Sequence, residues 1–260
     1  MAALPVAAAT SQTITFNPLP DRNYGDAPFD VSGYASASSG LPVSFSSLGK
    51  CTVAGTTVTI TGAGVCTIKA NQAGNATFNP APLKVRSFRI NRAALTITAD
   101  DKTRPSLDSN PAFTAQYSGF VYGEDPSDLG GSLTCTSTGI SVSPAGTYRI
   151  FCFGRISTNY KITYVNGTLT ITKLDQTITF DPISNMTFGD PPFTLSPAPT
   201  ASSGLFVKLT ATGPCTVPAS SWFGPIKMTG TGLCTITAHQ PGNRNYNAAP
   251  DVPQSFNINP

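Results

Sequence analysis

The feature that most constrains the fold of this chain is an internal repeat. Residues 12–53 align without a gap to residues 176–217, and 21 of the 42 aligned positions are identical. After a four-residue insertion, residues 66–91 match residues 234–259 at 14 of 26 positions. The chain thus begins and ends with copies of one unit, and tandem modules are expected rather than a single large domain.

A third unit of similar size lies between the two copies without close identity to them. We predict an N-terminal extension at 1–11, a first repeat at 12–91, a middle domain at 92–173 and a second repeat at 174–260. The connections "SFRINRAALTIT" and "TLTITKLDQTITF" contain no Gly/Ser-rich spacer. Because short connections limit hinge motion, we expect an elongated rod on the order of 100 Å long.

Each module consists of short alternating runs such as "TITF", "TVTIT", "YRIFCF" and "TLTIT", separated by clusters of Gly, Pro, Asn and Asp. Alternation at period two indicates strands with one buried face. Glu124 is the sole glutamate and charged residues make up 11% of the chain, a composition that disfavours helices. The predicted fold class is all-β, with three tandem Ig-like β-sandwich domains. The Cys and Trp pattern of antibody domains is missing, so the likeness is in outline only.

The six cysteines fall two to a module, and each pair recurs at the same stage of its unit. The repeat predicts disulfides within modules, and buried free thiols or a zinc site are the alternatives. Zinc is disfavoured because C-x-x-C spacing is absent and the one histidine, His239, cannot complete three sites. Disulfides indicate an oxidising compartment, so we expect an extracellular or cell-surface protein. The expected pairs are Cys51 with Cys66, Cys135 with Cys152, and Cys215 with Cys234.

No enzyme signature is found in the sequence. A Ser/His/Asp arrangement has to use His239, which lies beside a turn. Calcium binding is disfavoured because the repeated "GD" loop supplies one carboxylate. A Lys–Asn crosslink is disfavoured as well, because it needs a buried acid and only Glu124 or an aspartate could serve. We therefore predict a protein that is not an enzyme and has no cofactor or metal.

The loops "NYGDAPF" and "TFGDPPF" recur in the two copies, while the polar residues just before them change. This pattern favours a fold signature over a chemical site. We expect the Gly to take a conformation that other residues avoid and the Asp to accept hydrogen bonds from nearby amides. The aromatic residues of both loops should pack into the end of the sandwich; they are Tyr24, Phe29, Phe188 and Phe193.

Two segments are candidates for contacts with partners. Trp222 and Phe223 lie in an insertion, "PASSWFGPIK", that the first copy lacks, and could bind a host or surface glycan or protein. The apolar N-terminal segment, with Leu4 and Val6, could add a strand to an identical subunit and build a filament. The net charge of +3 is scattered along the chain, and no stretch of 18 apolar residues occurs, so neither nucleic acid nor membrane insertion is expected.

The segment "LTITADDKTRP…NYKITYVNGTLTIT" resembles the MBG repeat, the mostly-beta, glycine-rich domain of large bacterial surface and secreted proteins. The outer units, with "QTITF", "YGDAPF" or "FGDPPF", and "ASSGLPV", are similar to the bacterial Ig-like repeats that often accompany it. The resemblance implies neighbouring repeats as partners, a structural or adhesive stalk, and no catalytic residues to carry over. Related middle units usually have "YGD" where this chain has "RPSLDSNPAF", so the turn after Thr103 is expected to be rebuilt.

Overall fold

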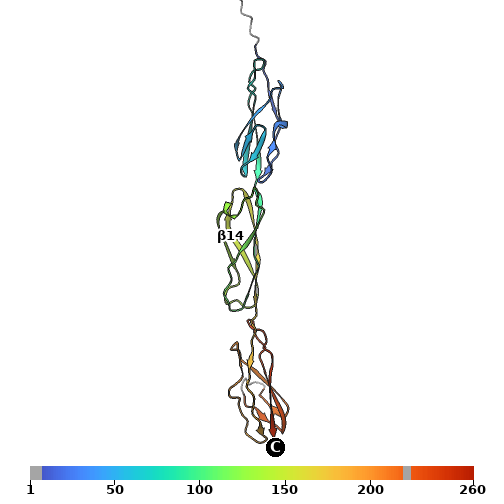
Figure 1. The fold of residues 1–260 in the computed structure, drawn as a ribbon, viewed down its shortest axis with the longest axis vertical. Helices are drawn as coiled ribbons and strands as arrows, with labels where there is room; N and C mark the ends of the chain where they lie inside the picture. The colour runs from blue at the N-terminus through green and yellow to red at the C-terminus, as the bar shows by residue number, and fades with distance from the viewer. Residues whose placement is uncertain (1–7, 219–223) are drawn as a thin grey trace, which may run out of the picture. The chain divides into compact units, whose positions relative to one another are not determined.

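The protein is described by a computed structural model that covers residues 8–218 and 224–260. Within these residues the chain is built of strands and two short 3₁₀ helices, and no α-helix occurs (Figure 1). No helix among the described residues has the length and apolar character that crossing a membrane requires. The all-β fold class predicted from the alternating runs is confirmed.

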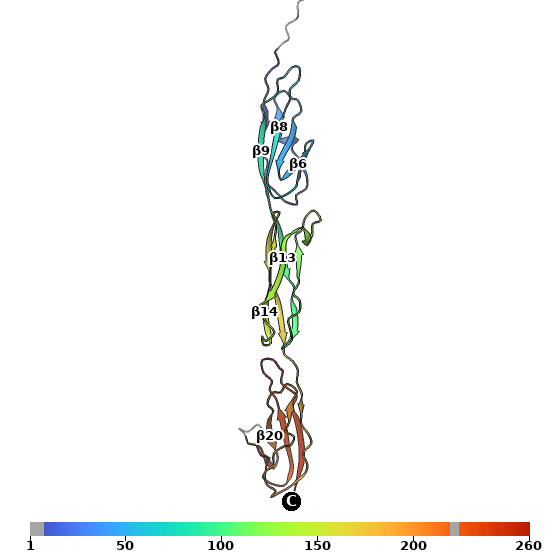
Figure 2. The ribbon, with the colours of Figure 1, turned by 90° about the vertical axis from the view of Figure 1, so that its left-hand side faces the viewer.

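The first module is a sandwich of short strands. A four-stranded sheet, in the order β2-β9-β8-β5, faces the three-stranded sheet β3-β7-β6 and the pair β1-β4. The longest strands, β8 and β9, run antiparallel side by side (Figure 2). The strands are β1 (Ile14–Phe16), β2 (Arg22–Asn23), β3 (Phe29–Asp30), β4 (Ala35–Ala37), β5 (Ser44–Gly49), β6 (Cys51–Ala54), β7 (Thr57–Ile60), β8 (Gly64–Asn71) and β9 (Lys84–Asn91), with the 3₁₀ helix η1 (Ser32–Tyr34) between β3 and β4.

The last module repeats this plan. Its four-stranded sheet has the order β18-β24-β23-β20, and the pairs β17-β19 and β21-β22 complete the sandwich. The strands are β17 (Ile178–Thr179), β18 (Met186–Thr187), β19 (Thr200–Ala201), β20 (Lys208–Thr212), β21 (Cys215–Thr216), β22 (Lys227–Met228), β23 (Gly232–His239) and β24 (Val252–Asn259).

The glutamine of the shared "QTITF" segment is buried and hydrogen-bonded in both copies. In the first module Gln12 donates to the carbonyl of Asn79 at 2.7 Å and accepts a hydrogen bond from Ser39. In the last module Gln176 makes the same two contacts, donating to Asn247 at 2.6 Å and accepting from Ser203. Since a buried amide is costly without partners, this glutamine holds the ends of the sandwich strands together.

The middle segment has a different sheet order. One sheet is β12-β10-β15, in which β10 and β15 are parallel, and the other is β11-β16-β14-β13. The elements are β10 (Ala93–Ala99), β11 (Lys102–Pro105), β12 (Ala115–Ser118), η2 (Pro126–Asp128), β13 (Gly130–Ser137), β14 (Gly146–Ile156), β15 (Tyr160–Val165) and β16 (Gly167–Thr172).

The turn after Thr103 is built around a buried arginine. Arg104 donates through Nε to the side chain of Asn110 at 2.7 Å and through Nη2 to the carbonyl of Ile140 at 2.7 Å. Asn110 in turn donates to the carbonyl of Gly139 at 2.7 Å. A guanidinium with fixed carbonyl acceptors thus organises the loop that follows Thr103.

By compactness the chain divides into two units, each of which contains one outer module and part of the middle segment. Unit 1 comprises residues 1–100, 114–136 and 151–166, and unit 2 comprises 101–113, 137–150 and 167–260. Strands β13 and β14 therefore supply residues to both units. The predicted module boundaries and the elongated rod stay predictions.

Candidate functional site

The "GD" loop of the first module is the tight turn that the repeat predicts. Gly25 has a φ of +105°, which other residues rarely adopt. Asp26 accepts a hydrogen bond from the amide of Asn23 at 2.9 Å, which closes the turn. The turn presents Tyr24, which follows β2, to residues of the middle segment that belong to the same compact unit.

Tyr24 is hydrogen-bonded to Glu124, the sole glutamate of the chain. The hydroxyl of Tyr24 donates to Oε1 of Glu124 at 2.6 Å, and the hydroxyl of Tyr160 donates to Oε2. The Tyr160 hydroxyl also accepts a hydrogen bond from the amide of Val121 at 3.1 Å. The two tyrosine rings meet edge to face with centroids 5.7 Å apart. Hydrogen bonds to a carboxylate are stronger than those between neutral groups, so Glu124 holds both tyrosine hydroxyls firmly.

Both phenols of the cluster are held in the protonated form. Tyr24 is 6% exposed and Tyr160 is 2% exposed. Burial, followed by the hydrogen bond to Glu124, raises the pKa of Tyr160 to about 12. The same two causes, in the same order, raise the pKa of Tyr24 well above its usual value of 10. The cluster therefore acts as a structural clamp at neutral pH, because neither phenol ionises there.

Further contacts surround the clamp. The hydroxyl of Tyr122 donates to the carbonyl of Asp26 at 2.8 Å. Asn159 accepts a hydrogen bond from the amide of Ala63 at 3.0 Å. The side chain of Val121 lies against Gly25 so closely that an added Cβ would come within 2.7 Å of it.

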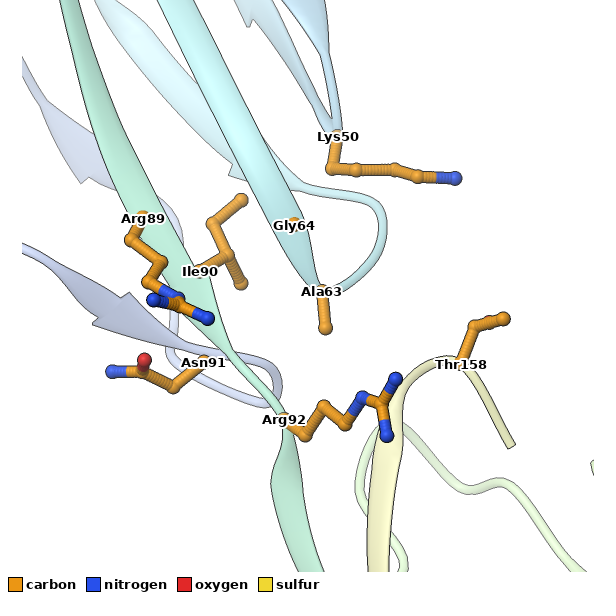
Figure 3. Close-up of a pocket in the computed structure, with 8 residues that line it drawn as sticks. All are labelled: Lys50, Ala63, Gly64, Arg89, Ile90, Asn91, Arg92 and Thr158. Carbon is orange, nitrogen blue, oxygen red and sulfur yellow. The ribbon is translucent and has the colours of Figure 1, made fainter. Parts of the chain in front are cut away.

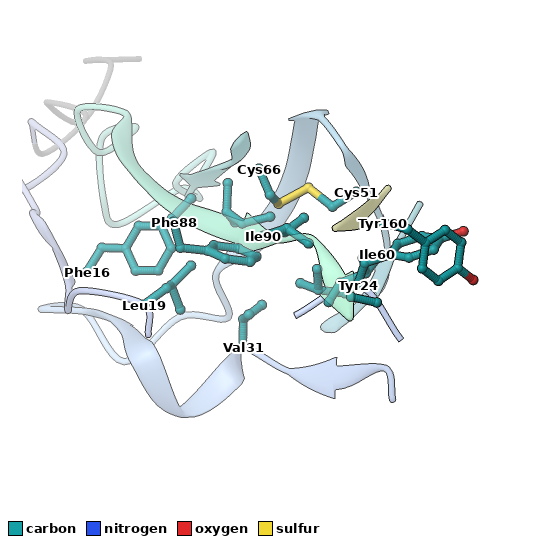
Figure 4. Close-up of a cluster of buried hydrophobic side chains, with 14 of the residues drawn as sticks. Phe16, Leu19, Tyr24, Val31, Cys51, Ile60, Cys66, Phe88, Ile90 and Tyr160 are labelled. Carbon is teal, nitrogen blue, oxygen red and sulfur yellow. A yellow bond between two sulfur atoms is a disulfide. The ribbon is translucent and has the colours of Figure 1, made fainter. Parts of the chain in front are cut away.

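The apolar core is continuous across this contact. The buried cluster that contains Phe16, Phe88 and Ile90 of the first module also contains Tyr160 of the middle segment (Figure 4). Leu129 of the middle segment belongs to the same cluster. By contrast, the cluster of the last module consists of residues between 178 and 258 only. The first module and the adjoining part of the middle segment thus share one core.

A cavity of about 440 Å³ lies beside the contact (Figure 3). Three exposed cationic side chains, Lys50, Arg89 and Arg92, line it together with Thr158, and none of its described lining residues is acidic. What such a lining can bind is an anion. The last module lacks this charge, since Pro214, Asn257 and Pro260 stand at the positions of the three cations.

The second "GD" loop keeps the turn but not the contact. Gly189 has a φ of +107°, and Asp190 accepts a hydrogen bond from the amide of Thr187 at 3.0 Å, as in the first copy. Phe193 is half-buried and packs edge to face on Phe256, with centroids 5.9 Å apart. Phe188, however, is 50% exposed, so the prediction that it packs into the sandwich end is wrong. The matched Tyr24 is buried because residues of the middle segment cover it.

The six cysteines form three disulfides, each within one predicted module. In the two outer modules the bond connects the sheets, since Cys51 lies on β6 and Cys66 on β8, and the last module repeats this with β21 and β23. In the middle segment the bond joins the neighbouring strands β13 and β14 of a single sheet, with 4.1 Å between the Cα atoms. The remaining pairs are Cys135–Cys152 and Cys215–Cys234.

A Thr-His-Asp arrangement, which sequence reasoning missed, lies on the last module. Nε2 of His239 is 2.7 Å from Oγ1 of Thr210, and Nδ1 is 2.7 Å from Oδ1 of Asp251. Thr210 lies on β20, which pairs with β23, so Thr210 and His239 meet across two strands and form no local sequence motif. The side chains of His239 and Asp251 are 30% and 57% exposed. A hydrolytic triad works in a water-excluded site beside donors for an oxyanion, so we interpret this open arrangement as a cross-strand contact.

The predicted partner-binding residues Trp222, Phe223, Leu4 and Val6 lie outside the described residues. Among the described residues no group of His, Cys, Asp or Glu is arranged to hold a metal ion. The carboxylates that the sequence offered for calcium are used in turns, as Asp26 and Asp190 illustrate.

The middle segment is similar to a known domain family. Residues 95–170 match the family model described as "MBG domain (YGX type)". No curated protein sequence matches the chain.

Among solved structures, Drosophila N-cadherin EC1-4 shares 12% identity with the chain over 95% of its length and 74% of the cadherin chain, with a TM-score of 0.29. Sidekick-1 immunoglobulin domains 1-4 give 12% identity over 95% and 76%, also with a TM-score of 0.29. Domains 1-6 of the surface layer protein SbsC give 16% identity over 98% and 41%, with a TM-score of 0.25. These scores are too low to carry an argument, so the match of residues 95–170 to the YGX-type MBG family model stands by itself.

Proposed function

We propose that the chain is a non-enzymatic structural segment of an extracellular protein, in which tandem β-modules act as a stiff spacer in the stalk of a bacterial surface or secreted protein. The observation that carries the proposal is the Tyr24–Glu124–Tyr160 clamp. It joins two modules whose strands β9 and β10 are separated by a single residue, Arg92.

The chemistry of the joint suits a spacer. A module joined by a flexible linker moves freely, whereas one that shares a packed core and charge-assisted hydrogen bonds with its neighbour has to break them to move. The first module and the middle segment share both kinds of contact. Three disulfides support an extracellular site, because such bonds persist in oxidising compartments.

Small-angle X-ray scattering of the full chain tests this proposal. We expect a maximum dimension on the order of 100 Å for three sandwiches in tandem. A matched variant with a flexible Gly-Ser spacer of about ten residues inserted after Arg92 should give a broader distance distribution and a flexible-chain scattering profile. A native chain whose profile is as flexible as that of the variant would refute the spacer function.

A further inference from the structure

The two "GD" loops can be compared directly, because the loop of the first module is covered and the loop of the last module is exposed. Tyr24 is 6% exposed, whereas the matched Phe188 is 50% exposed. A Cβ added at Gly25 would meet Val121, but one added at Gly189 would meet nothing within 4 Å. The backbone of the two loops is otherwise the same, since the amides of Tyr24 and Phe188 donate to the last residue of β9 and β24 at 2.9 and 2.8 Å. The loop of the last module therefore has the same backbone contact as the first loop but is exposed where the first is covered.

The occupant of the first loop defines what fits the second. On the first module it is the end of a domain that presents Val121, Glu124 and Tyr160. This domain follows β9 after one residue, and β24 pairs with β23 and β18 as β9 pairs with β8 and β2. A domain of the same kind, joined or brought to the end of β24, meets the same loop from the same direction.

The substitutions between the copies specify the chemistry of this occupant. Phe188 has no hydroxyl, so a carboxylate placed against it as Glu124 is placed against Tyr24 would be desolvated without that donor. Arg22 of the first copy corresponds to Met186, and Lys50 corresponds to Pro214. Each exchange replaces a polar or charged side chain by an apolar one, so the second surface favours an apolar contact.

We propose that the end of the last module formed by Met186, Phe188, Gly189 and Asp190 is a docking surface for a further MBG-type domain, one that places an apolar side chain where the middle segment has Glu124. The covered Tyr24 loop supplies the geometry of the complex, and the change from Tyr24 to Phe188 supplies the specificity. This inference concerns a second surface and holds whether or not the chain is a spacer.

The test extends the full chain after Asn259 with a second copy of residues 92–173. Two forms of the appended copy are compared, one native and one carrying Glu124→Leu, and each is combined with native Phe188 or with Phe188→Tyr. Hydrogen exchange of residues 184–193, which occur once in the chain, is measured by mass spectrometry. Residues 20–29 serve as the internal reference for a covered loop, and thiol titration after denaturation checks that the appended copy has formed its disulfide.

With native Phe188, the copy carrying Glu124→Leu should slow exchange of residues 184–193 about tenfold or more, and the native copy should slow it less. With Phe188→Tyr the native copy should slow exchange more than the copy carrying Glu124→Leu, because the new hydroxyl can donate to the carboxylate. Unchanged exchange in all four folded chains would overturn the docking surface. Equal protection by both copies with native Phe188 would overturn the apolar specificity.

Discussion

The hydroxyl of Tyr24 and the carboxylate of Glu124 are 100 residues apart in sequence and 2.6 Å apart in space. This contact connects a turn of the first repeat with a loop of the middle segment. It places the one glutamate of the chain where two modules meet.

Removing the hydroxyl of Tyr24 should weaken the contact between the first module and the middle segment. We expect Tyr24→Phe to destabilise the first module by about 1.5 to 3 kcal/mol, because the carboxylate loses one of its donors while the ring is retained. Hydrogen exchange of residues 20–30 under native conditions measures the change without assuming a two-state transition of the whole chain. Phe188→Tyr is the matched control, and it should change stability by less than about 0.5 kcal/mol since its new hydroxyl stays exposed. Equal effects of the two substitutions would contradict the clamp.

Alkaline pH should weaken the same contact. The fold raises the pKa of Tyr160 to about 12 and that of Tyr24 further, so it favours the protonated phenols. Their contribution to stability is complete below the ordinary tyrosine pKa of about 10 and is lost as the pH rises from there through 12. Urea unfolding of the first module at pH 8, 10 and 11, in brief incubations, should show this loss. The double variant Tyr24→Phe, Tyr160→Phe should lose less stability over this pH range. An equal loss in both proteins would show that the two phenols are not its cause.

The disulfides of the outer modules should matter for the contact between sheets. Replacing Cys51 and Cys66 by Ala should cost about 3 kcal/mol in the chain-entropy model and accelerate exchange in both sheets of the first module. Replacing Cys135 and Cys152 should cost a similar amount but affect mainly the sheet of β13 and β14, which the bond already joins within one layer. An equal rise of exchange in both sheets of the middle segment after the Cys135 and Cys152 replacement would contradict this difference between the two kinds of disulfide.

The Thr210–His239–Asp251 arrangement should have a minor structural role. We expect His239→Ala to change the unfolding free energy by less than about 1 kcal/mol, as is usual for exposed ion pairs. The native chain should hydrolyse p-nitrophenyl acetate no faster than this variant. A rate that is clearly higher in the native chain and disappears with Thr210→Val would reveal a hydrolytic site.

Some of these features could be predicted from the sequence because they repeat or are local. The alternating runs around Cys66 and Ile150 became β8 and β14 since period-two burial needs only neighbouring residues. The pairing of Cys51 with Cys66 follows from its recurrence in the second copy. The roles of Gly25 and Asp26 are confirmed for the same reason, because a turn closed within four residues is encoded within those residues.

The clamp could not be predicted in this way. Glu124 is the sole glutamate of the chain, but its partners lie 100 and 36 residues away and share no sequence pattern with it. The prediction for Phe188 failed because two similar loops were assumed to have similar surroundings. Local sequence determined the shape of the loop, and the neighbouring domain determined whether it is buried.

Rotational diffusion of the modules, measured by ¹⁵N NMR relaxation, shows whether the joint at Glu124 is stiff. We predict that residues of the first module and those of β10, β12 and β15 tumble as one body in the native chain. We also predict that Glu124→Ala separates their correlation times while each remains folded. Independent tumbling of the two in the native chain would contradict the shared core and the clamp as the basis of a stiff joint.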